Sequence, residues 1–271
     1  MNRVMVGMMA TVLAMGVAAH AETLQIDGST TVGPVADAFA EYFKNVQPDL
    51  AITVKKTGSG DGAAALIDGR CDVATMSRFM KTEEFQKAVA NNVLPVAHVV
   101  AMDGVCVAVH PSNPVKSLTS AQVRDIYAGK IANWNQVGGS NTPIVVISRD
   151  TSSGTYETFE SLIMKKTPMA ASVEYVNANP QAQARVRTTA GAIGYVGLGF
   201  QEGVKILAID GITPTRQTVA NGTYPIARPL FLFTNGYPKL GSVVHKLVSF
   251  YLTEKGQELV EAKGFVPLTN Y

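Results

Sequence analysis

The chain has 271 residues, 46% of them hydrophobic and 16% charged, and its 23 Lys and Arg nearly balance its 21 Asp and Glu. This balance gives no long-range attraction for nucleic acid or for an anionic membrane surface, so neither is an expected partner. Anion binding would need a local arrangement of charged side chains and backbone N–H groups.

Residues 1–21 have the three parts of a secretory signal peptide. Arg3 supplies the positive charge, residues 4–17 are apolar, and Ala19-His20-Ala21 matches an A-x-A cleavage site. The mature chain is therefore expected to begin at Glu22. No later stretch reaches the roughly 18 uninterrupted apolar residues of a membrane span, and no cysteine lies at the cleavage site to carry a lipid. The prediction is a soluble protein of the periplasm of a Gram-negative bacterium.

The first part of the mature chain alternates strand-like and helical segments. Strands are expected at residues 23–26, 51–55 and 73–76, and a helical pattern of apolar residues follows each of them. This alternation predicts an α/β fold whose ligand site lies in the loops that follow the strands.

Three loops rich in glycine and hydroxyl side chains precede helical patterns, at residues 27–34, 57–62 and 148–155. At a helix N-terminus, unpaired N–H groups and the helix dipole favour an anion. Ser and Thr are also the usual N-cap residues, so each loop taken singly could be only a cap. Arg149 has no capping role, and its planar guanidinium can donate two hydrogen bonds to a tetrahedral anion.

The middle and the end of the chain contain further elements. Apolar runs at residues 93–102 and 105–109 are separated by Asp103-Gly104, and a strand at residues 144–147 leads to Arg149. The chain closes with a strand and two helical patterns, at residues 230–233, 239–252 and 254–262.

These elements predict two lobes. We expect residues 22–104 and 227–271 to form lobe 1, into which residues 105–226 are inserted as lobe 2. The chain then crosses between the lobes twice, and an anion between them would be held from both sides. Closure would exclude water and strengthen each polar contact.

The cysteines and histidines indicate no metal site. Cys71 and Cys106 could form a disulfide in an exported protein or remain as two buried thiols, and their spacing does not decide between these states. The histidines of the mature chain, His98, His110 and His245, do not have the spacing of metal ligands. No cofactor is predicted.

Five motifs in chain order resemble the periplasmic phosphate-binding protein of bacterial phosphate ABC transporters, the PstS family. They are DGSTT at 27–31, TGSG at 57–60, DVATMSR at 72–78, IYAGKI at 126–131 with NW at 133–134, and Arg149 with SGT at 153–155. The resemblance covers nearly the whole mature chain. It implies the two-lobed type II periplasmic binding protein fold, an α/β fold of mixed sheets flanked by helices with two hinge crossovers.

The resemblance also implies a set of phosphate ligands. Arg149 would supply the main positive charge. Hydrogen bonds from hydroxyl or backbone groups would come from Thr30, Thr31, Ser59, Ser153, Gly154 and Thr155.

One position departs from well-known family members. There a carboxylate after the third strand accepts the phosphate proton and so rejects sulfate, whereas here that position is Ser77, followed by Arg78. Asp61 is the nearest candidate for a substitute acceptor, and the Ser77 hydroxyl can also accept, with less discrimination. Arg78 is expected either to touch the anion or to pair with a carboxylate such as Asp61 or Asp103.

The leading hypothesis is a monomeric receptor, not an enzyme, that captures inorganic phosphate and delivers it to the inner-membrane phosphate ABC permease. The alternatives are a receptor for sulfate, molybdate or tungstate, a secreted phosphatase or hydrolase that uses Ser153, and an extracellular adhesive or scaffold role. The hydrolase is disfavoured because the Ser153 loop lacks the first glycine of a G-x-S-x-G elbow.

Overall fold

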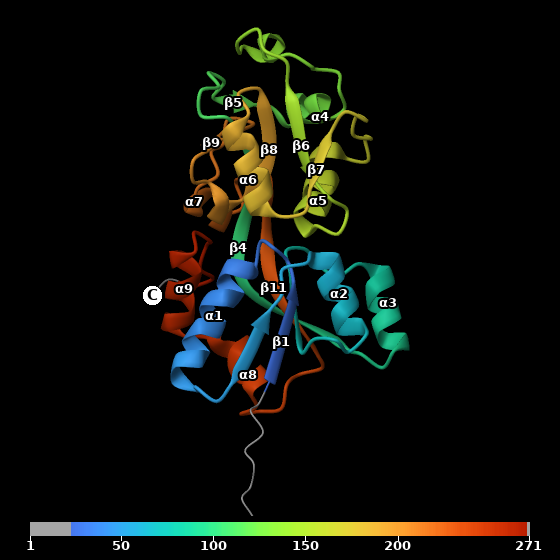
Figure 1. The fold of residues 1–271 in the computed structure, drawn as a ribbon, viewed down its shortest axis with the longest axis vertical. Coiled ribbons are helices and arrows are strands. Elements are labelled where there is room, and N and C mark those ends of the chain that lie inside the picture. Colours follow the sequence, from blue (N-terminus) through green and yellow to red (C-terminus); the bar gives the residue numbers. More distant parts are fainter. Residues whose placement is uncertain (1–22, 270–271) are drawn as a thin grey trace, which may run out of the picture.

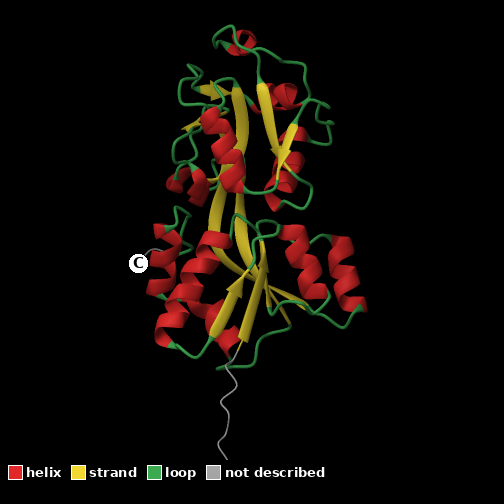
Figure 2. Cartoon of the chain, in the orientation of Figure 1, coloured by secondary structure: helices red, strands yellow, loops and turns green. Residues whose placement is uncertain are grey.

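Two lobes lie end to end along the long axis of the molecule (Figure 1). The computed structural model describes residues 23–269, so the predicted signal peptide lies outside the described residues. Within this range the fold is mixed α/β, as predicted, with helices on both sides of the strands (Figure 2). None of the helices between residues 23 and 269 is long and apolar enough to cross a membrane.

Lobe 1, at the bottom of Figure 1, is built on a mixed sheet. Its strand order is β2 (Ala51–Val54), β1 (Thr23–Gly28), β3 (Val73–Met76), β11 (Ala227–Asn235) and β4 (Pro95–Val109). The first three strands are parallel to one another, and β11 runs antiparallel to both β3 and β4. The helices of this lobe are α1 (Gly33–Val46), α2 (Ser59–Ile67), α3 (Thr82–Ala90), α8 (Val243–Ser249) and α9 (Glu254–Ala262), with the 3-10 turn η4 (Phe250–Leu252).

Lobe 2 continues the same sheet. The second half of β4 pairs with β8 (Ala192–Gly197), which is followed by β6 (Val145–Arg149) and β7 (Glu174–Val176), and β9 (Lys205–Ile206) also pairs with β4. A separate ribbon joins β5 (Ser117–Leu118) to β10 (Ala208–Ile209). The helices are α4 (Ser120–Tyr127), α5 (Gly154–Phe159), α6 (Asn179–Thr188) and α7 (Arg216–Ala220), with the short turns η1 (Trp134–Val137), η2 (Glu160–Met164) and η3 (Leu198–Phe200).

The strands β4 and β11 carry the chain between the lobes. Gly104 of β4 still pairs with Ala227 of β11, whereas the next residue, Val105, pairs with Gly197 of β8. The strand therefore changes partner between Gly104 and Val105. We propose that the lobe boundaries lie at this point, after residue 104 and before residue 227.

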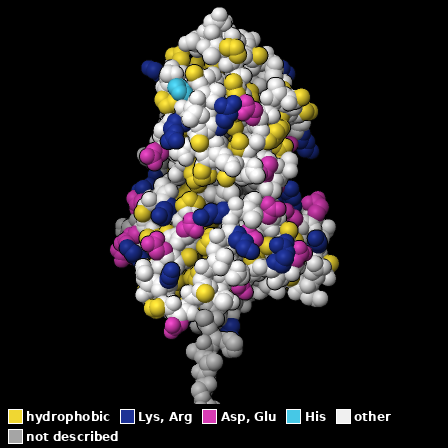
Figure 3. All heavy atoms as spheres, viewed as in Figure 1, with side chains coloured by type: hydrophobic (Ala, Val, Ile, Leu, Met, Phe, Trp, Pro, Cys, Tyr) yellow, Lys and Arg dark blue, Asp and Glu magenta, His cyan; other side chains and the backbone are white. Residues whose placement is uncertain are grey.

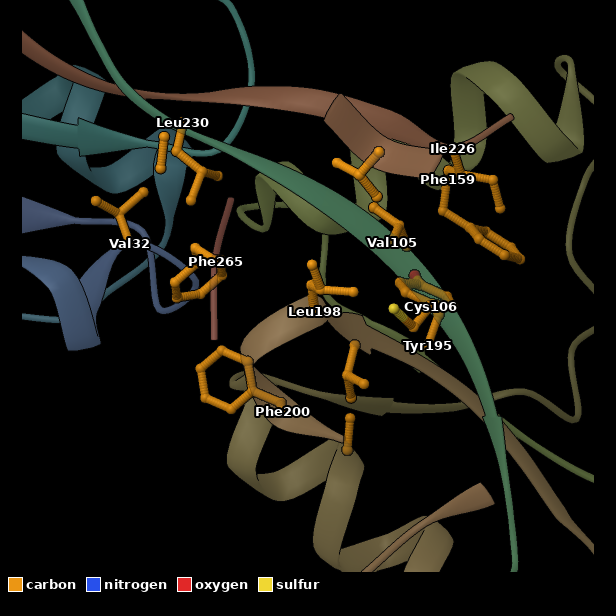
Figure 4. Packing of buried hydrophobic residues seen from close by; sticks show 14 of the residues in the cluster. Val32, Val105, Cys106, Phe159, Tyr195, Leu198, Phe200, Ile226, Leu230 and Phe265 are labelled. Atoms are coloured by element: carbon orange, nitrogen blue, oxygen red, sulfur yellow. The ribbon is translucent and has the colours of Figure 1, made fainter. Parts of the chain in front are cut away.

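Apolar packing continues through the crossover (Figure 4). Leu198 and Phe200 lie near Phe265 and Val32 of lobe 1, and the rings of Phe200 and Phe265 are 6.4 Å apart. Burial of this surface stabilises the contact between the lobes on the hinge side, at about 25 cal/mol per Å² of apolar area removed from water.

The structure answers the question that the cysteine spacing left open. Cys71 and Cys106 are both buried and both free. Burial is the main cause that raises the pKa of Cys71, to about 12, so this thiol stays protonated at neutral pH. Both residues therefore act as small apolar side chains of the core.

Charges of both signs are interspersed over the face shown in Figure 3. This distribution agrees with the near balance of 23 basic and 21 acidic residues in the sequence. This face is therefore not expected to attract either anionic or cationic partners over long distances.

Candidate functional site

The candidate site lies where loops of the two lobes meet. Eight of the residues predicted from the sequence come together there, and all of them are buried. They are Thr30, Thr31, Ser59 and Ser77 from lobe 1, and Arg149, Ser153, Gly154 and Thr155 from lobe 2. We call this set the anion cage.

Direct contacts join the two halves of the cage. The hydroxyl oxygens of Thr31 and Thr155 are 3.0 Å apart. Arg149 Nη2 donates to Thr30 Oγ1 at 3.2 Å. A Cβ added to Gly154 would lie 2.5 Å from Ser59 Oγ. The lobes are therefore in a closed arrangement around the cage.

Arg149 is the principal charge of the cage. Its side chain is only 1% exposed, and it donates from Nε to Val176 O at 3.2 Å and from Nη2 to Asn177 O at 2.6 Å. The third nitrogen, Nη1, is buried and has no hydrogen-bond partner among the described residues. Burial lowers the pKa of Arg149 to about 10, so the group is cationic at neutral pH.

No carboxylate lies within ion-pair distance of Arg149 in residues 23–269. A buried cation with a free donor and no paired carboxylate is costly unless an anion contributes the missing partner. The electrostatics of the cage therefore favour a small anion.

The core of lobe 2 holds Arg149 in place. Its backbone N–H donates to the hydroxyl of Tyr195 at 3.1 Å, and that hydroxyl also contacts Ser148 Oγ at 2.8 Å. The Tyr195 ring is stacked on Phe159, with ring centres 4.1 Å apart. The end of β6 is thus fixed by buried aromatic side chains rather than by the loop alone.

The loop after β6 makes a tight turn into α5. The carboxylate of Asp150 accepts hydrogen bonds from both N–H and hydroxyl of Ser152. Ser153 Oγ accepts from the N–H groups of Thr155 and Tyr156, so this serine does cap the helix. A hydroxyl that accepts in this way can still donate its proton into the cage.

Two features shape the lobe 1 side of the cage. Gly28 has a φ of +133°, and a Cβ there would lie 2.2 Å from Thr75 O, so glycine is required for the chain to leave β1 past β3. Ser59, at the start of α2, accepts from Ser77 N at 3.0 Å and lies 3.3 Å from Ser77 Oγ. The two serine hydroxyls therefore face each other.

Two residues that were not predicted from the sequence contact the cage. Asn179, the first residue of α6, donates to Thr30 and Thr31, and Arg228 of β11 donates to Thr31 and Thr155. Asn179 stands before Pro180 and reads as an ordinary helix start. Arg228 lies next to a strand pattern. The signal that could have found Arg228 is the position of an arginine beside the apolar run at residues 230–233.

Comparison with known proteins places the chain in a family. A family model for the PBP superfamily domain matches residues 14–255. Protein SphX of Synechococcus elongatus is 34% identical over 261 residues, which cover 89% of this chain and 76% of that protein. The phosphate-binding protein PstS of Staphylococcus epidermidis is 33% identical over 254 residues, with 89% and 77% covered.

A solved structure gives the same result. A protein of Clostridium perfringens, assigned as a phosphate ABC transporter substrate-binding protein and solved with bound phosphate, has a TM-score of 0.84 and 31% identity. The match covers 92% of this chain and all of that one. The chain belongs to the PstS family. The type II periplasmic binding protein fold predicted from the sequence is confirmed.

The structure does not bring Asp61 to the cage. Asp61 lies in the first turn of α2, and its side chain is exposed, while Ser59 two residues earlier is buried. A carboxylate in a first turn interacts favourably with the helix dipole, which accounts for this residue. Asp61 is therefore not placed to act as the substitute proton acceptor that the sequence suggested.

Arg78 also differs from the expectation. Its guanidinium binds Glu84 through both Nη atoms, at 2.8 and 2.7 Å, and its Nε lies 2.5 Å from Glu157 Oε2. The predicted partners Asp61 and Asp103 are not used. Because Glu84 and Glu157 occupy the guanidinium, we leave Arg78 out of the proposed phosphate ligands.

The contact of Arg78 with Glu157 joins the lobes. Glu157 belongs to α5 of lobe 2, and Lys81 Nζ of lobe 1 lies 3.1 Å from its other oxygen. Burial raises the pKa of Glu157, and the attraction of Arg78 and Lys81 opposes this shift without cancelling it. Arg78 keeps its two hydrogen bonds to Glu84 when the Glu157 charge is lost, so the effect of losing that charge alone should be mild.

Reversal of this charge should instead open the lobes. Glu157→Lys would place a third cation beside Arg78 and Lys81, and we expect it to weaken phosphate binding about tenfold by disfavouring closure. Glu157→Gln should change the Kd by no more than about threefold, because Glu84 still pairs with Arg78. Titration calorimetry measures both. Glu160→Lys is the matched control, because Glu160 forms no ion pair with lobe 1 among residues 23–269. Equal effects of the two lysine variants would contradict this role.

Proposed function

We propose that this protein is a periplasmic receptor that captures phosphate between its lobes and delivers it to an inner-membrane ABC permease. The observation that carries the proposal is the buried, cationic Arg149, whose Nη1 lacks a partner within the described residues and which lies among hydroxyl groups from both lobes. The relatives with phosphate in their names support the choice of anion.

The cage suits a tetrahedral oxyanion. Arg149 supplies a charge-assisted hydrogen bond, and Thr30, Thr31, Ser59, Ser77, Ser153, Gly154 and Thr155 supply hydroxyl and backbone donors. Closure removes water from these contacts, which strengthens them relative to an open cleft. Binding and closure are thus coupled, because each lobe contributes part of the cage.

Selectivity rests on hydroxyl groups in this proposal. The Ser59 and Ser77 hydroxyls can accept the proton of HPO₄²⁻, but they can equally donate to an unprotonated oxygen. Phosphate should therefore be preferred over sulfate by less than in relatives with a carboxylate at the Ser77 position. A receptor for sulfate, molybdate or tungstate remains the second candidate for this reason.

The other parts of the proposal follow from the sequence. The predicted signal peptide at residues 1–21 directs export, and the exported protein acts as a monomer. The protein acts without catalysis. Within residues 23–269, the hydrogen bonds of the Ser153 hydroxyl come from backbone N–H groups, and no histidine or carboxylate activates it as a nucleophile.

Titration of the desalted mature protein with phosphate, arsenate, sulfate and molybdate tests the proposal. Phosphate and arsenate should bind most tightly, and each should raise the melting temperature. At a free anion concentration 100 times the Kd, the folded state should gain about 2.7 kcal/mol. Absence of heat and of a thermal shift with all four anions would rule out the receptor role, and tightest binding of sulfate or molybdate would favour the second candidate.

A further inference from the structure

We propose that Asn179, together with Arg228, sets the direction of the hydroxyl hydrogen bonds in the cage, so that the threonine side presents protons to the anion. Neither residue need touch phosphate, so each is a positioning residue. This inference rests on the proposed phosphate function. It concerns which side of the cage binds the protonated oxygen of the anion and which side binds the unprotonated oxygens.

The orientation of the Asn179 amide follows from its neighbours. Asn179 is fully buried, and the N–H of Gly197 donates to its Oδ1 at 3.1 Å. A backbone N–H can only donate, so the amide oxygen must face Gly197. The amide NH₂ group therefore faces the other way, and it donates to Thr31 Oγ1 at 2.8 Å and to Thr30 Oγ1 at 3.2 Å.

Arg228 imposes the same direction from the hinge. Its guanidinium is held by Asp103, the residue opposite it on β4, through Nε at 3.0 Å and Nη2 at 2.8 Å. The same Nη2 lies 3.0 Å from Thr155 Oγ1 and 3.4 Å from Thr31 Oγ1. Arginine has no acceptor atom, and Asp103 takes one of the two Nη2 protons. The other is donated to Thr155 Oγ1 and shared at longer range with Thr31 Oγ1.

These contacts leave few hydrogen-bond acceptors for the threonine hydroxyl protons. The oxygens of Thr30, Thr31 and Thr155 all receive hydrogen bonds from amide or guanidinium groups, with Arg149 as a further donor to Thr30. The contact between Thr31 and Thr155 uses one proton of that pair at most. The remaining hydroxyl protons need an acceptor, and the unprotonated oxygens of the anion provide one.

The two sides of the cage therefore differ in polarity. The threonine side is a set of donors that suits oxygens without a proton. On the serine side, Ser59 Oγ accepts from Ser77 N and lies 3.3 Å from Ser77 Oγ, and no amide or guanidinium side chain within residues 23–269 donates to either hydroxyl. Each of these hydroxyls can therefore still act as donor or acceptor. The proton of HPO₄²⁻ is accordingly directed to the serine side.

A double-mutant cycle between Asn179 and Thr31 tests this inference, with phosphate affinity measured by titration calorimetry. Asn179→Ala should weaken binding about tenfold, because the hydroxyls lose their fixed direction. In the Thr31→Val background the same change should cost about threefold or less, because its main target is absent. The matched control is Gln183→Ala, one turn further along α6, where the amide contacts Glu202 O and should not affect binding.

Asn179→Asp covers the case in which Asn179→Ala does not fold, since it keeps the size and the acceptor for Gly197. Its carboxylate would accept the Thr31 proton instead of donating to that hydroxyl, so the loss of affinity should again be larger with the Thr31 hydroxyl than without it. Equal effects of the Asn179 change with and without the Thr31 hydroxyl would overturn the inference. In that case, phosphate binding by the wild type would still support the receptor role. Failure of wild type and Gln183→Ala to bind phosphate would overturn both.

Discussion

Arg149→Ala is expected to abolish measurable phosphate binding while the protein stays folded. The variant removes the buried cation that has no carboxylate partner in residues 23–269, so a bound dianion would lose its charged donor. Loss of one member of a buried charge pair costs roughly 3 to 5 kcal/mol, which corresponds to at least about a hundredfold in Kd.

Arg149→Lys should recover only part of the affinity. A single ammonium group cannot reproduce the bonds of Nε to Val176 O and of Nη2 to Asn177 O while a third donor faces the anion. Titration calorimetry and thermal melting measure binding and folding separately. Arg187→Ala, an exposed residue of lobe 2, makes the same change in net charge and should leave the Kd unaltered. A folded Arg149→Ala protein with wild-type affinity would remove the centre of the proposed site.

Gly154→Ala is expected to weaken phosphate binding about a hundredfold by preventing full closure. The added methyl group would lie 2.5 Å from Ser59 Oγ and 2.7 Å from Ser77 Oγ, both in the other lobe. Overpacking of this kind costs typically 1 to 3 kcal/mol, and only the closed state is affected. Alanine also favours the helical start of α5, so the melting temperature without anion should not fall.

Gly60→Ala is the matched control for this effect. Gly60 faces the same seam, but a Cβ there would lie 3.5 Å from Ser152 O, an ordinary contact, and the N–H that donates to Ser152 O is kept. Its Kd should stay within about twofold of wild type. Small-angle scattering should show compaction on phosphate addition for wild type and Gly60→Ala, and much less for Gly154→Ala. Equal compaction and affinity in all three proteins would contradict the closure model.

Much of the site could be predicted because its signals are local. The hydroxyl and glycine loops precede helices, and Arg149 follows a buried strand, so their chemistry depends on a few neighbouring residues. The break at Asp103-Gly104 likewise marks the place where β4 changes partner from β11 to β8. The sequence by itself therefore determined the fold class, the loops that form the cage and the identity of its principal cation.

Only the tertiary structure decided the partners of the remaining polar side chains. Asp61 and Ser59 are two residues apart on α2, yet helical geometry turns one to solvent and the other to the cage. Arg78 takes Glu84 and Glu157, and Arg228 takes Asp103, because strands and helices far apart in the chain bring these charges together. Asn179 enters the cage for the same reason. Hydrogen bonds between segments far apart in the chain depend on how the lobes pack, and local sequence patterns do not predict that packing.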